Sequence, residues 1–242
     1  MSEFGRLRAG SVIAGDFEVL RSLSEGGMGA VYVVLQKSTG HERALKVMHT
    51  QLTANASLRS KFVREAKISA KIDSEHVVQV LAAGIDEESS TPWLVMELLR
   101  GQDLRAFVDE KGPPTQAHAR EIFAQLSHGL SAAHRVGVIH RDLKPENIFL
   151  SRSSRKDAPV TVKILDFGIA KIAAEAKTHG SMAIGSPFWM APEQAQIGEE
   201  INAATDVWAL GLMAFFVLTG KVFWRSAQLE EATPVVVMKE LL

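Results

Sequence analysis

The sequence predicts an α+β protein in two parts, a small antiparallel β lobe with one helix followed by a mainly helical larger lobe. Residues 17–20, 31–35 and 44–47 have strand-like patterns with glycine-containing turns nearby. Within 119–133, apolar residues recur at spacings of three and four, which is typical of a helix with one apolar face. Because the pattern changes from strand to helix at 99–101, we expect the boundary between the lobes there.

This boundary divides the chain into an N-terminal extension over 1–16, a small lobe over 17–98 and a larger lobe over 99–242. Thr115 is the expected N-cap of the first long helix in the larger lobe. The other predicted elements are a helix over 58–72, strands over 77–81, 93–96, 148–150 and 162–165, and a helix over 205–219.

The composition argues against several classes of protein. The 242 residues carry 27 basic and 28 acidic side chains, so no net field favours nucleic acid or an anionic membrane. Cysteine is absent, which excludes disulfides and thiol nucleophiles and suits a reducing compartment. No segment approaches the ~18 apolar residues of a membrane span, and the N-terminus lacks the apolar core of a signal peptide. We expect a soluble, cytoplasmic protein.

A glycine cluster lies between the first two predicted strands. Gly26, Gly27 and Gly29 would let the backbone approach a phosphate closely, although a tight hairpin alone also explains them. A dinucleotide-binding turn would be followed by a helix. Because a second strand follows instead, the pattern favours a β-hairpin that covers phosphates.

Lys46 lies in the third predicted strand, and Glu65 lies in the helix that follows it. A lysine–glutamate pair could hold the ammonium group against the α- and β-phosphates of a nucleotide. Taken singly, Lys46 is better explained as a surface-facing lysine, and Glu65 is equally well explained as a solvated helix charge. The pair therefore indicates a nucleotide site only in combination with the motifs that follow it in the sequence.

The most informative segment is HRDLKPEN at 140–147. Phosphoryl transfer needs a carboxylate to orient the acceptor hydroxyl, a cation near the transferred phosphate and oxygen ligands for magnesium. Asp142, Lys144 and Asn147 supply these groups in one loop, and Asp166 of the DFG segment at 166–168 adds a second metal ligand. The order and spacing together predict a phosphoryl-transfer site.

With these motifs in this order, the chain resembles the eukaryotic-type, or Hanks-type, protein kinases over about 17–221. The segment EGGMGAVY at 25–32 is similar to bacterial members in particular. The resemblance implies the two-lobed kinase fold, with Lys46 on the α- and β-phosphates and Glu65 as its partner. It also implies Asp142 as the catalytic base, and Asn147 and Asp166 as ligands of Mg²⁺, with Mn²⁺ as an alternative.

The same resemblance implies a site for ATP. Val31 and Ala44 would cover the adenine and Phe149 would form its floor, while Glu97–Leu99 would be the hinge. Asp103 is either a ribose contact or a helix N-cap. The full set assigned to ATP is Leu23, Gly26, Gly27, Gly29, Val31, Ala44, Lys46, Glu97, Leu99 and Phe149.

Lys144, two residues after Asp142, is typical of the serine/threonine branch. The resemblance thus implies transfer of the γ-phosphoryl group of ATP to serine or threonine of protein substrates. A nucleotide-binding scaffold with weak catalysis is the main alternative. A small-molecule phosphotransferase is a second one, disfavoured by Lys144 and by the APE segment at 191–193.

Arg141, next to the expected base, suggests regulation by a phosphorylated loop, for which Thr178 and Ser181 are the candidate phosphosites. The chain ends at Leu242, where the family has further helices. We therefore expect a C-terminally truncated larger lobe, with reduced activity and self-association through the apolar helix over 205–219.

Overall fold

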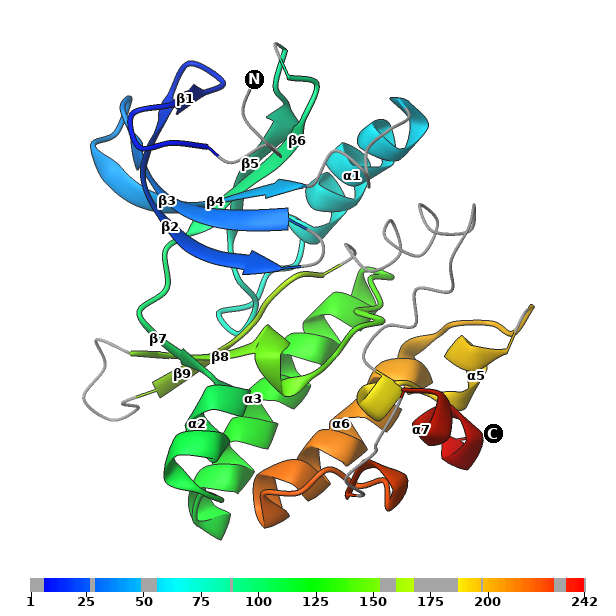
Figure 1. The fold of residues 1–242 in the computed structure, drawn as a ribbon. Helices are drawn as coiled ribbons and strands as arrows, with labels where there is room; N and C mark the ends of the chain where they lie inside the picture. The colour runs from blue at the N-terminus through cyan, green and yellow to red at the C-terminus, as the bar shows by residue number, and fades with distance from the viewer. Residues whose placement is uncertain are drawn as a thin grey trace. The chain divides into compact units, whose positions relative to one another are not determined.

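The computed structural model describes residues 7–26, 29–48, 56–87, 89–152, 160–167, 187–196, 198–228 and 234–241. These residues divide into two compact units. The first contains the described residues of 7–71 and 78–99, and the second contains those of 72–77, 100–167 and 187–241. Figure 1 shows their elements from blue at the N-terminus to red at the C-terminus.

The first unit is an antiparallel sheet of six strands in the order β1-β2-β3-β4-β6-β5. One helix, α1 (Ala56–Ser69), packs against β5 and β6. Its strands are β1 (Val12–Ile13), β2 (Phe17–Gly26), β3 (Gly29–Gln36), β4 (His41–Met48), β5 (Val80–Ile85) and β6 (Pro92–Glu97). The antiparallel sheet and single helix predicted for the first third of the sequence are confirmed, and β1 is an additional strand.

The core of this unit comes from apolar side chains on one side of the curled sheet. Val34, Leu45 and Val95 are fully buried, and the ring of Phe17 lies 5.7 Å from that of Trp93. Each large apolar side chain buried in this way contributes ~1.5–3 kcal/mol to stability. The register of β3 against β4, in which Val31 faces Lys46, is therefore fixed by the core.

One predicted strand is displaced in the structure. We expected a strand over 77–81, but β5 begins at Val80 and extends to Ile85. Val77, which belongs to the second unit, instead forms a parallel bridge with Ile164 of that unit. Gln79 exchanges hydrogen bonds with Glu97, donating its backbone N–H to the Glu97 carboxylate and accepting from the Glu97 N–H. These tertiary contacts determine where the strand starts.

Asp16 closes the turn between β3 and β4. Its carboxylate accepts hydrogen bonds from the Ser38 backbone N–H at 2.8 Å and from the Ser38 hydroxyl at 2.7 Å. The hydroxyl and backbone hydrogen bonds of Ser38 lower the pKa of Asp16 below its ordinary value. The ionised form is thus favoured in the folded state, so its stabilising contribution exists above the unfolded-state pKa and is lost as the pH falls through the folded-state pKa.

We therefore predict that Asp16→Asn lowers the melting temperature at pH 7, and that this difference shrinks as the pH falls below about 4. Thermal melts of the two proteins across that pH range measure the effect. Asp73→Asn, which alters an exposed carboxylate, is the control. A difference between wild type and Asp16→Asn that does not change with pH would contradict this role of Asp16.

The second unit combines a three-stranded antiparallel sheet with helices. Asp103 and Thr115 are the N-caps of α2 (Leu104–Lys111) and α3 (Gln116–Arg135). Their side chains accept from Ala106 N and His118 N, so the predicted cap at Thr115 is confirmed. The strands are β7 (Gly101–Asp103), β8 (Ile148–Arg152) and β9 (Val160–Ile164). The helices are α2 (Leu104–Lys111), α3 (Gln116–Arg135), α5 (Pro192–Ala195), α6 (Ala203–Thr219) and α7 (Pro234–Leu241). The 3-10 turns are η2 (Pro145–Asn147), η3 (Pro187–Trp189) and η4 (Ser226–Gln228).

Helix α6 begins two residues before the predicted start and ends at Thr219, as predicted. Asn202 caps its N-terminus, and Gly220 ends it with a φ of 72°. One face of α6 is buried, whereas Val207, Trp208 and Leu218 are 60%, 41% and 53% exposed. Among the described residues, no helix is both long enough and apolar enough to cross a membrane.

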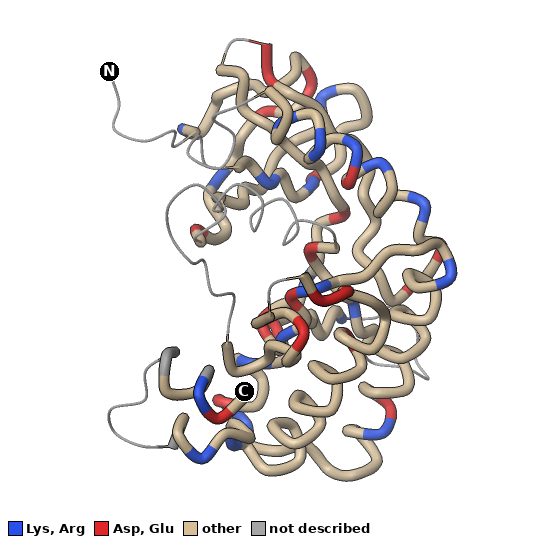
Figure 2. Tube along the Cα trace, turned by 90° about the vertical axis from the view of Figure 1, so that its right-hand side faces the viewer, with Lys and Arg blue, Asp and Glu red and all other residues tan. Residues whose placement is uncertain are grey.

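Charged residues of both signs are interspersed along the described trace of each unit, as Figure 2 shows. This distribution agrees with the near-equal numbers of basic and acidic residues in the sequence.

Candidate active site

Lys46 lies in the middle of β4, between Val31 of β3 and Leu94 of β6 in the register of the sheet. Its side chain is buried, which is unusual for lysine and points to a specific role. Glu65 lies on α1 next to the buried Ala66, and 14% of its side chain is exposed. Helix α1, which carries Glu65, packs on β6, and β6 is the strand that pairs with β4 at Lys46.

The glycine cluster forms the end of the β2–β3 hairpin, where Gly26 pairs with Gly29. A Cβ atom on Gly29 would lie 2.1 Å from the Val47 carbonyl oxygen, so the close approach of β3 to β4 requires glycine there. A Cβ atom on Gly26 would meet no atom within 4 Å. The hairpin predicted between two strands is therefore present, and packing alone explains Gly29. Gly27 lies outside the described residues.

The residues assigned to adenine have different surroundings. Ala44 is buried and pairs with Val33 and Met96. Val31 and Leu99 are partly buried, and Leu23 is exposed. The backbone N–H of Glu97 already donates to the Gln79 carbonyl, so it is engaged within the sheet.

The second unit brings together the three polar residues of the HRDLKPEN segment. The Lys144 ammonium lies 2.9 Å from Oδ2 of Asp142. Nδ2 of Asn147 donates to the backbone oxygen of Asp142 at 2.7 Å and to its Oδ2 at 3.3 Å. Asp142 is 17% exposed and Lys144 is 21% exposed, so the cluster is shielded but reachable. The predicted proximity of these groups is confirmed by the geometry.

His140 fixes the start of this loop from a fully buried position. Its Nε2 lies 2.7 Å from the Leu165 carbonyl oxygen, which can only accept, so Nε2 carries the proton. Nδ1 is then the acceptor for the Asp142 N–H at 3.3 Å. The ring also packs edge-on against Phe167 at 4.8 Å. His140 thus connects the loop to the DFG segment.

Asp206, in the first turn of α6, holds the same loop from the other side. Its carboxylate accepts from the backbone N–H groups of His140 and Arg141, both at 2.9 Å. Nε2 of His134 lies 2.7 Å from its Oδ2. The side chain is 1% exposed, and a carboxylate so deeply buried needs donors of this kind. Asp206 therefore supports the backbone on which Asp142 sits.

The β8–β9 pair places the two proposed metal ligands near each other. Ile148 pairs with Ile164, and the Leu165 N–H donates to the Asn147 carbonyl at 2.8 Å. Asp166 follows directly. Because both hydrogen bonds of the Asn147 side chain use Nδ2, its amide oxygen is the atom left for a cation, and Asp166 adds a carboxylate. These oxygen donors fit Mg²⁺.

Two non-glycine residues of the site have left-handed backbone conformations, Arg141 with φ 70° and Asp166 with φ 61°. Such conformations cost of order 1–3 kcal/mol and persist where the surroundings hold them. At Arg141 the surroundings include the bond from its N–H to Asp206 and the bond from Gln194 to its carbonyl. One of these two residues directly precedes Asp142, and the other is a proposed metal ligand.

The segment after η3 is tied to the same loop. Nε2 of Gln194 donates to the Arg141 carbonyl at 2.7 Å, and its Oε1 accepts from the Ala191 N–H. Glu193 accepts from the hydroxyl of Thr205 at 2.6 Å. Residues 191–194 are thereby fixed against the loop and against α6.

Sequence reasoning did not assign site roles to Asp206, Gln194 or His134. A signal for Asp206 existed, because a carboxylate at the start of a strongly apolar helix must find donors when it is buried. Gln194 and His134 carry no comparable signal. The candidate phosphosites Thr178 and Ser181 lie outside the described residues.

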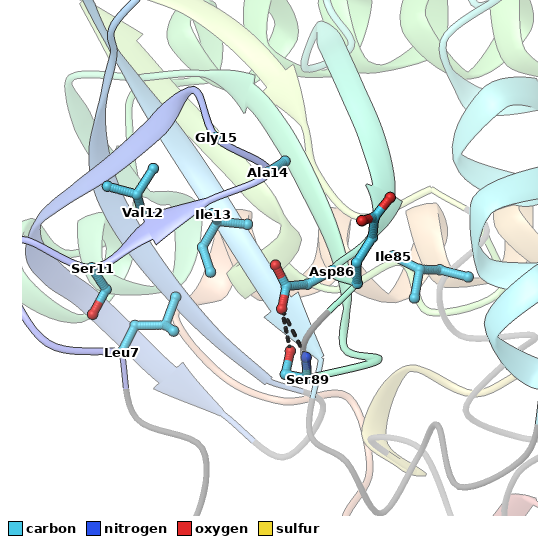
Figure 3. Close-up of a pocket in the computed structure, with 10 residues that line it drawn as sticks. Leu7, Ser11, Val12, Ile13, Ala14, Gly15, Ile85, Asp86 and Ser89 are labelled. Carbon is cyan, nitrogen blue, oxygen red and sulfur yellow. Dashed lines mark hydrogen bonds between the residues drawn. The ribbon is translucent and has the colours of Figure 1, made fainter.

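A separate cavity of about 940 Å³ lies in the first unit (Figure 3). Leu7, Ile13, Ile85 and Asp86 are among the residues that line it. The Asp86 carboxylate accepts from the backbone and hydroxyl of Ser89 and so closes the β5–β6 turn. None of the predicted site residues is among the lining residues described for this cavity.

Comparison with known proteins agrees with this geometry. A family model described as "Protein kinase domain" matches residues 17–240. The serine/threonine-protein kinases pkn2 and Pkn1 of Myxococcus xanthus are 37% and 41% identical to this chain over 215 and 214 residues. Each alignment covers 87% of this chain but 25% and 30% of the relative, so the chain spans less than a third of their length.

The fold has a similar counterpart among solved structures. The crystal structure of the M. tuberculosis PknI kinase domain aligns with a TM-score of 0.73 and 25% identity, covering 90% of this chain and 77% of that one. The family match spans both units, and the similar solved structure is also a kinase domain. This chain belongs to the protein kinase domain family, and the relatives it matches are bacterial serine/threonine kinases.

Proposed function

We propose that this chain is a serine/threonine protein kinase that transfers the γ-phosphoryl group of ATP to hydroxyl groups of protein substrates. The observation that carries the proposal is the cluster of Asp142, Lys144 and Asn147, whose side chains converge within hydrogen-bond distance. Family membership supports it, as do the relatives in Myxococcus xanthus, which are named serine/threonine-protein kinases.

In the proposed reaction, Asp142 accepts a hydrogen bond from the serine or threonine hydroxyl and then takes its proton. The hydroxyl oxygen forms a bond to the γ-phosphorus while the bond from that phosphorus to the β–γ bridging oxygen breaks, and ADP leaves. Lys144, which already lies beside the Asp142 carboxylate, stabilises the negative charge on the transferred group. Asn147 holds the base in place through its contacts with Asp142.

Binding of the nucleotide is assigned by family resemblance. Lys46 would contact the α- and β-phosphates, with Glu65 orienting its ammonium group. Burial of Lys46 supports this role, because an enclosed ammonium group needs a negatively charged partner. The remaining contacts with ATP are proposed for the glycine hairpin, for Ala44 and Val31, and for the hinge at 97–99.

Asn147 and Asp166 would hold Mg²⁺, for which Mn²⁺ is an alternative. The metal, when bound, would neutralise charge on the β- and γ-phosphates. The adjacent placement of the two residues by the β8–β9 pair supports the assignment. The proximity of Lys144 and Asn147 to Asp142 supports transfer over the alternative of a catalytically weak scaffold.

A transfer assay with γ-labelled ATP, magnesium and three acceptors tests the proposal. The acceptors are the chain itself, casein as a generic protein, and an aminoglycoside as a small-molecule control. We expect label on protein and none on the small molecule. Label confined to the small molecule would contradict the proposal, and so would nucleotide binding without any transfer.

Autophosphorylation offers a further prediction about regulation. We expect phosphate at Thr178 first and at Ser181 second, because these hydroxyls precede the APE segment at 191–193 and Arg141 could pair with the added charge. Mass spectrometry of protein incubated with ATP, compared with phosphatase-treated protein, locates the sites. Active protein that remains unmodified at both residues would contradict this prediction.

A further inference from the structure

Trp224, between α6 and η4, makes a hydrogen bond that few other residue types could make there. The residue is 4% exposed, and its Nε1 donates to the backbone carbonyl of Phe188 in η3 at 2.8 Å. Phenylalanine at this position could fill similar space but could not donate. The indole therefore fixes one peptide group of the η3 turn in a way that apolar packing alone does not.

Helix α7 holds Trp224 in place through Glu240. The Glu240 carboxylate accepts from the backbone N–H groups of Arg225 and Ser226, at 3.0 and 2.9 Å, and from the Ser226 hydroxyl. Bonds from the Ser226 hydroxyl and backbone lower the pKa of Glu240 below its ordinary value, so the carboxylate stays ionised near neutral pH. We call these three hydrogen bonds to the Glu240 carboxylate the Glu240 cap. Because Arg225 and Ser226 directly follow Trp224, the Glu240 cap fixes the backbone that carries the indole.

Packing places η3 between these elements. The Trp189 ring lies edge-on to Phe216 of α6 at 5.7 Å, and α7 contacts both η3 and η4, with Val237 fully buried. Helix α7, red in Figure 1, contacts η3. The η3 turn is therefore held from the side of α6 and from the side of α7.

The segment that starts at η3 reaches the catalytic loop a few residues later, where Gln194 binds the Arg141 carbonyl. It is thus anchored at Phe188 by Trp224 and at Gln194 by the residue preceding Asp142. Because Gln194 contacts the residue before Asp142, we expect a protein acceptor that reaches Asp142 to meet this segment as well. A shift of η3 would therefore change the surface that the acceptor meets beside Asp142.

We propose that Trp224, held by the Glu240 cap, is a positioning residue for the protein acceptor, because it fixes the η3 turn of the segment tied to the Asp142 loop. The inference rests on the proposed kinase function. It assigns Trp224 no contact with ATP or with the reacting atoms. Losing the indole donor should therefore affect the acceptor and spare the nucleotide.

The experiment compares Trp224→Phe with Trp208→Phe in the full chain. The control makes the same chemical change at an exposed tryptophan of α6. Steady-state kinetics with casein and with ATP give separate KM values. For Trp224→Phe we expect the KM for casein to rise roughly 3- to 10-fold, the size of one lost hydrogen bond, with the KM for ATP unchanged. Trp208→Phe should change neither.

Hydrogen exchange over residues 187–196 provides a readout independent of turnover, and Trp224→Phe should speed exchange there. Glu240→Gln, with Glu110→Gln as its control, tests the cap without altering the core, and should shift the casein KM in the same direction. An active wild type with unchanged casein KM in both Trp224→Phe and Glu240→Gln would overturn this inference alone. A wild type that transfers no phosphate would overturn the proposed function and this inference with it.

Discussion

Replacing Asp142 with asparagine is expected to lower kcat by ~10²-fold or more, the usual size of a lost general base. The amide keeps the volume of the side chain and can still accept from Lys144, so the loop should remain folded. It cannot accept the proton of the acceptor hydroxyl. Because Asp142 is not assigned to the nucleotide, the affinity for ATP should stay close to that of wild type.

Initial rates of casein phosphorylation and calorimetric titration with a non-hydrolysable ATP analogue measure the two quantities. Asp109→Asn, a change at an exposed carboxylate of α2, is the matched control. Turnover by Asp142→Asn at the wild-type rate would show that another group accepts the proton.

Asp206→Asn should produce the largest loss of stability among single substitutions in this site. The carboxylate receives three donors, from His140, Arg141 and His134. An amide presents one oxygen to them, and its NH₂ group faces at least one N–H. With the amide oxygen toward His140 and His134, the NH₂ group faces the Arg141 N–H. Leaving that donor unsatisfied costs about 1–3 kcal/mol in the free energy of unfolding.

Urea unfolding of wild type, Asp206→Asn and the exposed-site control Asp73→Asn measures this difference. Activity should fall as well, because the strained backbone at Arg141 loses the bond to its N–H. If Asp206→Asn unfolds at the same urea concentration as wild type, the buried carboxylate does not support the loop as described.

The arrangement of secondary structure could be predicted wherever a local pattern was strong. The helix over 119–133 and the strand over 31–35 have clear periodicities and lie within α3 and β3. Strand β5 was displaced in the prediction because its last part, Ala82-Ala83-Gly84, has low strand propensity. Glycine is required at position 84 because a Cβ atom there would lie 2.6 Å from the Trp93 ring.

The cluster of Asp142, Lys144 and Asn147 could be predicted because its members lie within six residues of sequence and carry a recognisable motif. Its supports could not. Asp206 is 66 residues from His140, Gln194 is 53 from Arg141, and Trp224 is 36 from Phe188. Such pairs depend on how helices pack, which no local pattern encodes. The sequence therefore indicates the reacting groups and leaves their positioning to the structure.

Analysis of the phosphorylated residue tests the central claim most directly. Wild type and Asp142→Asn are each incubated with γ-labelled ATP, magnesium and casein, and the labelled protein is hydrolysed to its phosphoamino acids. The proposed function predicts phosphoserine or phosphothreonine from wild type and almost none from Asp142→Asn. Phosphotyrosine alone, equal label from both proteins, or no label from folded wild type would contradict it.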